Sequence, residues 1–284
     1  MNFNAYLRLT RLDKPIGILL LLWPTLWGLW FAAERLPPLN LLVIFVAGVV
    51  LMRSAGCSVN DYADRHFDGF VARTRKRPLA TGEITPGEAI GVAVALALLA
   101  LLVLWPIVTP LLLFLAVIAA FLAASYPFTK RFFAVPQAYL GLSFGFGIPM
   151  AYAAVQGSVP TEAGWLLLAN LFWSIAYDTE YAMVDRTDDL KIGIRTSAIT
   201  FGRFDVTIVM LCYAITLTLL AWIGAQHDLG ELFWLGLLAA AGIALYHYKL
   251  IRHRDPVRCF KAFLHNTWFG AAVFSGLALD YAIR

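Results

Sequence analysis

Charged side chains are scarce in this chain: 14% of its 284 residues are Asp, Glu, Lys or Arg, whereas 61% are apolar. Soluble domains usually carry about 25% charged residues. The shortage excludes an ordinary soluble protein and predicts an all-α, polytopic membrane bundle. No segment between the apolar runs is long enough to bury a core of its own. We therefore expect any chemistry to take place within the bundle or at its mouth.

Cysteine is also rare, and the three residues Cys57, Cys212 and Cys259 are widely separated. An odd number of distant thiols, mostly within or beside apolar runs, indicates neither a disulfide framework nor a zinc site. Cysteine therefore carries no functional signal in this sequence.

Long apolar runs, in contrast, fill most of the chain. A helix needs about 20 apolar residues to cross roughly 30 Å of hydrocarbon, although short or interrupted spans also occur. We predict about nine transmembrane helices, near 16–33, 39–59, 89–106, 108–125, 136–155, 163–177, 206–225, 232–249 and 262–280. The first run follows basic residues, as in a signal peptide, but it lacks a clear cleavage site, so we expect it to be retained as a span.

Positive charge gathers on one side of these predicted spans. Nineteen of the twenty-two Lys and Arg residues fall at the N-terminus, near 60–88, 126–135 and 178–205, and in 249–261. This is the positive-inside distribution, and it predicts a cytoplasmic N-terminus. The net charge of +4 therefore reflects topology and does not indicate a nucleic-acid partner.

Acidic residues gather in two long cytoplasmic connections, which hold eleven of the eighteen Asp and Glu residues. The segments NDYADRHFD and DTEYAMVDRTDD each place their acids at helical spacing, so we expect each set on one helix face. The candidate ligands are Asn60, Asp61, Asp64 and Asp68 in the first, on a continuing helix, and Asp178, Asp185, Asp188 and Asp189 in the second. Four helices separate the clusters, which hints at pseudo-repeats, about 1–135 and 136–284, within one domain 1–284.

Clustered carboxylates repel one another unless a cation lies between them. Carboxylate and amide oxygens without Cys or His suit Mg²⁺, which takes one or two carboxylates and shares a substrate phosphate. Candidate groups for anionic oxygen lie near the clusters and at the end of the fourth span: Arg73, Arg77, Tyr126, Lys130, Arg131, Lys191 and Arg195. The pattern predicts a Mg²⁺–diphosphate site, although single basic residues could equally be solvated loop charges or interfacial anchors.

Arg53 lies inside the second predicted span, where a charge costs roughly 2.5 kcal/mol or more and should face a polar cavity. It stands two helical turns before Asn60, on the same face. We expect its guanidinium to point into a cavity beneath the metal site and to bind a substrate carboxylate bidentately. The alternative is a structural pair with a helix carbonyl or an acid.

The two acidic segments are similar to the N-D-x-x-D-x-x-x-D and D-x-x-Y-A-x-x-D-x-x-D-D motifs of the UbiA superfamily of intramembrane aromatic prenyltransferases. Further segments look like its bacterial branch that acts on 4-hydroxybenzoate, namely RLDKPIG, LMRSAGC, RTRKRPLATG, YPFTKR and DDLKIGIRT. They occur in the family's order and together span most of the chain.

This resemblance implies a multi-pass protein of the bacterial cytoplasmic (inner) membrane, with its active site toward the cytoplasm. The implied reaction is Mg²⁺-dependent transfer of a polyprenyl group from polyprenyl diphosphate to the carbon ortho to the hydroxyl of 4-hydroxybenzoate, in ubiquinone biosynthesis. No obligate protein partner is indicated.

The resemblance also implies residue roles. The implied Mg²⁺–diphosphate ligands are Asn60, Asp64, Asp68, Asp185 and Asp189, with Asp61 and Asp178 in the same motifs. Arg53 matches a position associated with the acceptor carboxylate, and Tyr126 and Lys130 match positions near the diphosphate. Which of Asp188 and Asp189 ligates stays open. Asp185 could also help to remove the ring proton.

Other readings remain. Homogentisate, a naphthoate or haem are possible acceptors, although Arg53 favours a small aromatic acid. The segment DGFVAR resembles part of a CDP-alcohol phosphotransferase signature, but the spacing of Asp64 and Asp68 and the Pro at position 86 depart from it. An ion-coupled transporter usually holds its acids near the bilayer midplane, not at one edge.

Overall fold

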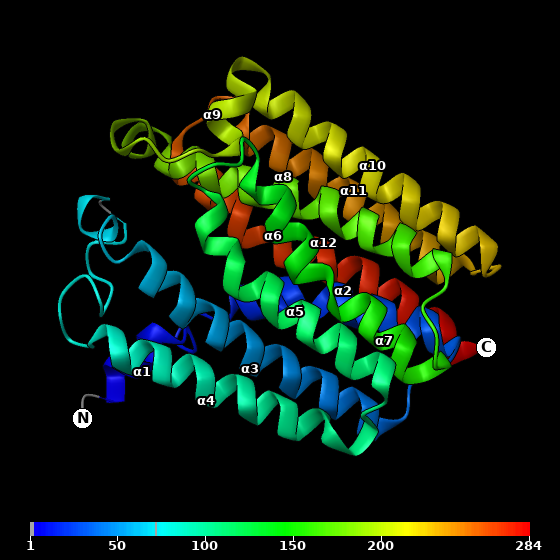
Figure 1. The fold of residues 1–284 in the computed structure, drawn as a ribbon. Helices are drawn as coiled ribbons and strands as arrows, with labels where there is room; N and C mark the ends of the chain where they lie inside the picture. Colours follow the sequence, from blue (N-terminus) through cyan, green and yellow to red (C-terminus); the bar gives the residue numbers. More distant parts are fainter. Residues whose placement is uncertain (1–2, 72) are drawn as a thin grey trace.

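The computed structural model describes residues 3–71 and 73–284, a bundle of helices without β-strands in these ranges (Figure 1). The α-helices are α1 (Phe3–Leu9), α2 (Ile16–Ala33), α3 (Leu39–Asp64), α4 (Pro86–Leu104), α5 (Pro110–Thr129), α6 (Pro136–Gly145), α7 (Gly147–Gln156), α8 (Thr161–Ile192), α9 (Ser197–Phe201), α10 (Asp205–Gln226), α11 (Glu231–Ile251) and α12 (Pro256–Ile283). Short 3-10 helices cover Asp68–Phe70, Trp105–Ile107 and Gly202–Phe204. The predicted all-α membrane fold is confirmed.

Seven helical segments among the described residues are long and apolar enough to cross a membrane. They are α2, α3, α4 with its 3-10 extension, α5, α6 with α7, α9 with α10, and α11. The helices α8 and α12, of 32 and 28 residues, are long enough but too polar for this group. Both pack among other helices of the bundle, α8 against α6, α10 and α12. The count of nine spans stays a prediction.

Several helices begin at a capping residue followed by proline. Thr85 and Glu88 form a reciprocal capping box at the start of α4, with Pro86 at the first helical position. The Thr109 hydroxyl accepts the Leu112 N–H at the start of α5, and the Asp255 carboxylate accepts the Arg258 N–H at the start of α12. These caps satisfy backbone donors that the first turn of a helix leaves unpaired.

The span predicted over 136–155 is found as the apolar segment Pro136–Gln156, but its helix is broken at Phe146 between α6 and α7. Pro149 lacks the N–H that would bond to the Gly145 carbonyl, so a continuous helix loses a hydrogen bond at this point. Gly145 also packs so closely on Asn170 of α8 that a Cβ there would collide with the Asn170 side chain. The break therefore follows from the local sequence and from packing.

The two acidic segments lie mainly on helices, as their helical spacing predicts, although the sequence assigns them to connections beyond the spans. The first α-helix with acids, α3, ends at Asp64, and the Asp64 carbonyl accepts the Phe67 N–H at 2.8 Å in a tight turn. Asp68 thus lies on a separate 3-10 helix, and the expectation of one continuing helix through Asp68 is wrong. In the second segment, α8 continues without a break to Ile192. Both acidic ends lie at the end of the bundle that carries α1, opposite the C-terminus (Figure 1).

A buried polar network joins the helices of the C-terminal half. The Tyr213 hydroxyl lies 3.0 Å from Glu180, 2.9 Å from His247 Nδ1 and 2.8 Å from Asn266 Oδ1. Asn266 donates to Glu180 at 2.8 Å, and all four side chains are fully buried. Since these residues come from α8, α10, α11 and α12, hydrogen bonds as well as apolar packing hold this half together.

A second polar cluster joins helix ends at the end of the bundle opposite the two acidic segments. His227, between α10 and α11, lies 2.8 Å from Glu162 in the first turn of α8 and 3.3 Å from the Tyr281 hydroxyl of α12. Glu162 also accepts the Tyr152 hydroxyl, and Arg284 donates to the His227 carbonyl at 3.2 Å. The cluster ties α7, α8 and α12 to the α10–α11 connection.

This cluster predicts a pH-dependent stability. The hydrogen bond to Glu162 raises the pKa of His227 above its ordinary value, although burial opposes the shift. The stabilisation is therefore complete below about pH 6.5 and is lost as the pH rises through the raised pKa. We expect the thermal unfolding midpoint of the purified protein to fall between about pH 6 and about pH 9. The His227→Gln variant should lack this component; an unchanged pH dependence in that variant would contradict the assignment.

Candidate active site

A polar pocket of about 100 Å³ lies at the acidic end of the bundle. It brings together acids from both sequence clusters, which are more than a hundred residues apart. The predicted residues that line it are Asp64, Asp68, Arg73, Arg77, Tyr126, Lys130, Asp178, Asp185 and Asp189. Gln137 and Tyr181, which were not predicted, line it as well. The helices α3, α5, α6 and α8 and the 65–85 connection therefore contribute to one site.

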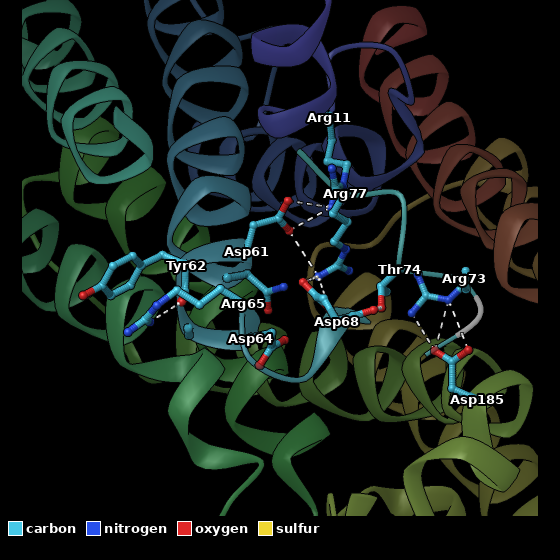
Figure 2. A network of polar contacts seen from close by, with 12 residues as sticks. Arg11, Asp61, Tyr62, Asp64, Arg65, Asp68, Arg73, Thr74, Arg77 and Asp185 are labelled. Atoms are coloured by element: carbon cyan, nitrogen blue, oxygen red, sulfur yellow. Dashed lines mark hydrogen bonds and ion pairs between the residues drawn. The ribbon is translucent and has the colours of Figure 1, made fainter. Parts of the chain in front are cut away.

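Three acids of the pocket, Asp64, Asp68 and Asp185, are paired with basic side chains. Figure 2 shows the contacts of Asp68 and Asp185. Lys130 Nζ lies 2.9 Å from Asp64 Oδ2 and 3.4 Å from the Asn60 amide oxygen. Arg73 donates to Asp185 from Nη2 at 2.5 Å and from Nε at 3.0 Å. Acidic and basic side chains of the pocket are therefore paired with one another.

Asp61 is a fully buried junction between two arginines. Arg11 Nη2 donates to its two oxygens at 2.8 and 3.1 Å, and Arg77 Nη1 lies 3.1 Å away (Figure 2). The same Arg77 nitrogen donates to both oxygens of Asp68 at 3.0 Å. Asp61 therefore fixes the N-terminal segment and the 65–85 connection against α3. Sequence reasoning missed the role of Arg11, because it counted this residue only as a flanking positive charge.

The charges of the 65–85 connection influence one another strongly. Burial raises the pKa of the Asp68 carboxyl, Arg77 opposes this shift, and the nearby Asp64 and Asp61 charges add to it. Burial disfavours the charged Arg77, yet Asp61 and Asp68 outweigh it and raise the Arg77 pKa. Arg77 therefore stays charged, whereas Asp68 is protonated more easily than an exposed carboxylate because its pKa is raised.

Seven predicted residues do not line the polar pocket. Three of them, Arg53, Asn60 and Asp61, line a larger cavity beside it, and the other four line neither. Asp188 pairs with Lys191 at 3.3 Å, whereas its neighbour Asp189 is buried and lines the pocket. Arg131 donates to the Ala63 carbonyl at 3.0 Å, and Arg195 donates to the Phe132 carbonyl at 3.1 Å. The contacts of Arg131 and Arg195 connect separate segments, whereas the Asp188–Lys191 pair lies within α8. None of the four residues lines the pocket.

Gln137 and Tyr181 support the pocket from its wall. The Gln137 amide oxygen accepts the Ser197 N–H at 2.9 Å, which fixes the start of α9 against α6. The Arg73 guanidinium lies over the Tyr181 ring, 4.3 Å from its centre, and this cation–π contact stabilises the positive charge of Arg73. Tyr181 lies within the second motif, which is a signal for its role, whereas nothing in the sequence distinguished Gln137.

A larger cavity of about 1280 Å³ adjoins the polar pocket. The two share Arg73, Arg77, Tyr126, Lys130, Asp178 and Tyr181. Farther along, apolar side chains of α3, α4 and α5 line it, among them Val94, Leu98, Leu101, Leu113 and Val117. The site therefore combines a charged end with a long apolar compartment, which suits a ligand with an anionic head and a greasy tail.

Arg53 lines this cavity below the acidic pocket. Its Nε is buried and makes no hydrogen bond within the described residues. Its guanidinium lies 5.4 Å from the centre of the Phe144 ring. No ion pair joins Arg53 to an acid in the described part of the chain. Its guanidinium is therefore available to bind an anionic ligand in the cavity.

The donor set of the polar pocket fits Mg²⁺. No group of three or more His, Cys, Asp and Glu residues within 3–71 and 73–284 is close enough to hold an ion by itself. Mg²⁺ normally takes one or two carboxylates and completes its shell with water and substrate phosphate. Carboxylates that face one another across a pocket beside Lys and Arg therefore suit a metal that binds together with a diphosphate.

The sequence pattern of the UbiA prenyltransferase family matches residues 21–270. The chain belongs to this family. A relative from Azoarcus sp. (strain BH72), named 4-hydroxybenzoate octaprenyltransferase, is 67% identical over 278 residues, which cover 98% of this chain and 96% of the relative. The family predicted from the sequence motifs is confirmed.

Solved structures of the family share the fold. A UbiA homologue from Aeropyrum pernix K1 in its apo form has a TM-score of 0.82 at 21% identity, with 93% of this chain and 97% of that chain covered. A homologue from Archaeoglobus fulgidus, bound to GPP and Mg²⁺, has a TM-score of 0.67 at 20% identity, with 95% and 99% covered. At this identity the likeness shows the fold alone.

Proposed function

We propose that this chain transfers a polyprenyl group from polyprenyl diphosphate to the ring carbon ortho to the hydroxyl of 4-hydroxybenzoate, as a step of ubiquinone biosynthesis. The observation that carries the proposal is the adjoining pair of compartments, in which acids of both motifs and several cations open into an apolar cavity that contains Arg53. The high identity to relatives named 4-hydroxybenzoate octaprenyltransferase supports the acceptor.

The polar pocket would hold the diphosphate. Asp64, Asp68, Asp178, Asp185 and Asp189 supply oxygens for Mg²⁺, which when bound acts as a Lewis acid that stabilises the leaving diphosphate. Arg73, Arg77 and Lys130 turn from their acids toward the diphosphate oxygens as negative charge develops there. These three side chains already line the pocket, so they need to move little to reach the diphosphate. The allylic C–O bond breaks as negative charge passes to the diphosphate.

The large cavity would hold the acceptor and the prenyl tail. Arg53 binds the acceptor carboxylate, which turns the phenol ring toward the allylic carbon. The ring carbon ortho to the hydroxyl forms the new C–C bond, and loss of its proton restores aromaticity. Apolar walls exclude water that would otherwise trap the allylic cation. Asp185 or another pocket carboxylate accepts the ring proton.

We also place the protein in the bacterial inner membrane, with the polar pocket at the cytoplasmic face. The concentration of Lys and Arg at the acidic end of the bundle supports this orientation. A water-soluble diphosphate head and Mg²⁺ would then reach the pocket from the cytoplasm, while the polyprenyl tail stays in the hydrocarbon of the bilayer.

The function is tested with the full chain purified and reconstituted in lipid nanodiscs. We expect octaprenyl diphosphate and 4-hydroxybenzoate to give 3-octaprenyl-4-hydroxybenzoate and diphosphate with Mg²⁺, and no product after EDTA treatment. Homogentisate and 1,4-dihydroxy-2-naphthoate serve as competing acceptors. If the enzyme prefers either of these, that compound and not 4-hydroxybenzoate is the acceptor. Turnover without Mg²⁺ would contradict the proposal that the acids bind the metal.

The adjacent acids Asp188 and Asp189 provide a matched comparison. Asp189 is buried in the pocket, whereas Asp188 pairs with Lys191 outside it. We expect Asp189→Asn to lower kcat/KM about ten- to a hundredfold and to raise the Mg²⁺ concentration needed for half-maximal rate. Asp188→Asn should change either quantity less than about twofold. The reverse order, measured by Mg²⁺ titration of the two variants, would exchange the two assignments.

A further inference from the structure

The guanidinium of Arg53 lies close to residues of two helices. It is 5.4 Å from the centre of the Phe144 ring of α6. It also packs against Gly17, which is buried near the start of α2. A Cβ at position 17 would lie 2.5 Å from Arg53 Nη2, 2.6 Å from Nε and 3.0 Å from Cζ. Arg53 can therefore occupy this place only because residue 17 has no side chain.

The three distances at Gly17 also tell which part of Arg53 the glycine covers. A point nearly equidistant from Nε and Nη2 and farther from Cζ lies beside the Nε–Nη2 edge, close to the guanidinium plane. The Nε atom on that edge is buried and has no hydrogen-bond partner in the described residues. The covered edge therefore cannot take a carboxylate, which leaves the terminal Nη1–Nη2 edge for a ligand in the cavity that Arg53 lines.

We infer that Gly17 and Phe144 are positioning residues that determine which edge of Arg53 meets the acceptor, and thereby select a small anionic aromatic acid. This inference rests on the proposed function. Gly17 and Phe144 both line the cavity with Arg53. These contacts hold the guanidinium although its Nε–H donates no hydrogen bond within the described residues. A preoriented guanidinium also loses less side-chain freedom on binding.

A side chain at position 17 should disturb this arrangement in a defined way. The Arg53 head is the flexible end of a long side chain, so Gly17→Ala displaces it into the cavity and leaves the helix backbone in place. The displaced guanidinium then presents its edge at the wrong position and fills space that the acceptor ring needs. The diphosphate pocket, formed by other residues, should be unaffected.

The test compares Gly17→Ala with Gly242→Ala in nanodiscs. Gly242 is an exposed glycine of α11 with open space around it, and its replacement adds the same methyl group within a helix. We expect Gly17→Ala to raise KM for 4-hydroxybenzoate about tenfold or more, as expected for a misplaced charged contact. KM for octaprenyl diphosphate should change less than about twofold, and Gly242→Ala should match the wild type in both constants.

A second measurement separates positioning from general damage. The wild type should prefer 4-hydroxybenzoate over its neutral analogue 4-hydroxybenzamide, and Gly17→Ala should lose most of this preference. Phe144→Leu removes the ring without adding atoms beside Arg53, and we expect it to raise KM for 4-hydroxybenzoate about three- to thirtyfold. Phe144→Leu also tests the inference if Gly17→Ala fails to fold.

The outcomes distinguish this inference from the proposed function. If the wild type does not prenylate 4-hydroxybenzoate at all, the proposed function fails. If the wild type does so, but the variants keep its KM and its preference for the carboxylate, the inference about Gly17 and Phe144 is wrong. Equal increases in KM for both substrates would also overturn it, because they indicate a loss of structure and not of acceptor positioning.

Discussion

Replacing Asp185 by Asn should lower the rate of prenyl transfer at least about a hundredfold. The substitution keeps the shape of the side chain but removes the charge that faces the pocket and holds Arg73 through two nitrogens. In the proposed site, both Mg²⁺ and the Arg73 guanidinium would depend on that charge. We expect kcat to fall and the Mg²⁺ requirement to rise, both measured in steady state with saturating acceptor.

A double-mutant cycle separates the two roles of Asp185. If Asp185 acts only by holding Arg73, Asp185→Asn combined with Arg73→Ala should be no worse than Arg73→Ala alone. If Asp185 also binds the metal, the double variant should be slower and should need more Mg²⁺ than Arg73→Ala. An Asp185→Asn variant with wild-type rate and wild-type Mg²⁺ dependence would remove this residue from the site.

Replacing Arg53 by Ala should lower kcat/KM for 4-hydroxybenzoate about a hundredfold, because a desolvated charge pair with the acceptor is lost. The Mg²⁺ dependence and KM for the prenyl diphosphate should stay near those of the wild type, since Arg53 lines the large cavity but not the polar pocket. Varying acceptor and metal separately in nanodiscs measures these quantities.

Arg53→Lys is the matched control for charge. A lysine keeps the positive charge but not the planar fork, so we expect an activity between those of the alanine variant and the wild type. An Arg53→Ala variant that loses metal affinity as strongly as acceptor affinity would contradict the carboxylate role.

The sequence indicated the two acidic clusters and Arg53 because charges are exceptional in an apolar chain. It did not reveal that Arg11 reaches Asp61, since residues fifty positions apart show no periodic relation. The spacing of the motif also could not tell which of the adjacent residues Asp188 and Asp189 lines the pocket, because either fits the helical spacing from Asp178 and Asp185. The contact of Asp188 with Lys191 resolves the difference in three dimensions.

Helix ends were harder to predict than helices. The spacing from Asp61 to Asp68 fits two turns of helix, but the chain turns after Asp64 and places Asp68 on a 3-10 helix. Pro149 was a visible signal for the break at Phe146, since a proline removes the bond to the residue four positions earlier. The long apolar run outweighed that local signal.

The length and polarity of α8 have a consequence for how the protein is made. Its 32 residues extend about 48 Å. Within it, Glu180 and Asn170 are fully buried. Glu180 accepts hydrogen bonds from Tyr213 of α10 and Asn266 of α12, and Asn170 donates to the Gly141 carbonyl of α6. Such a helix is a poor candidate to enter lipid alone. We expect α8 to stay near the insertion machinery until α10 and α12 have been synthesised, so the second half of the active site would be completed last.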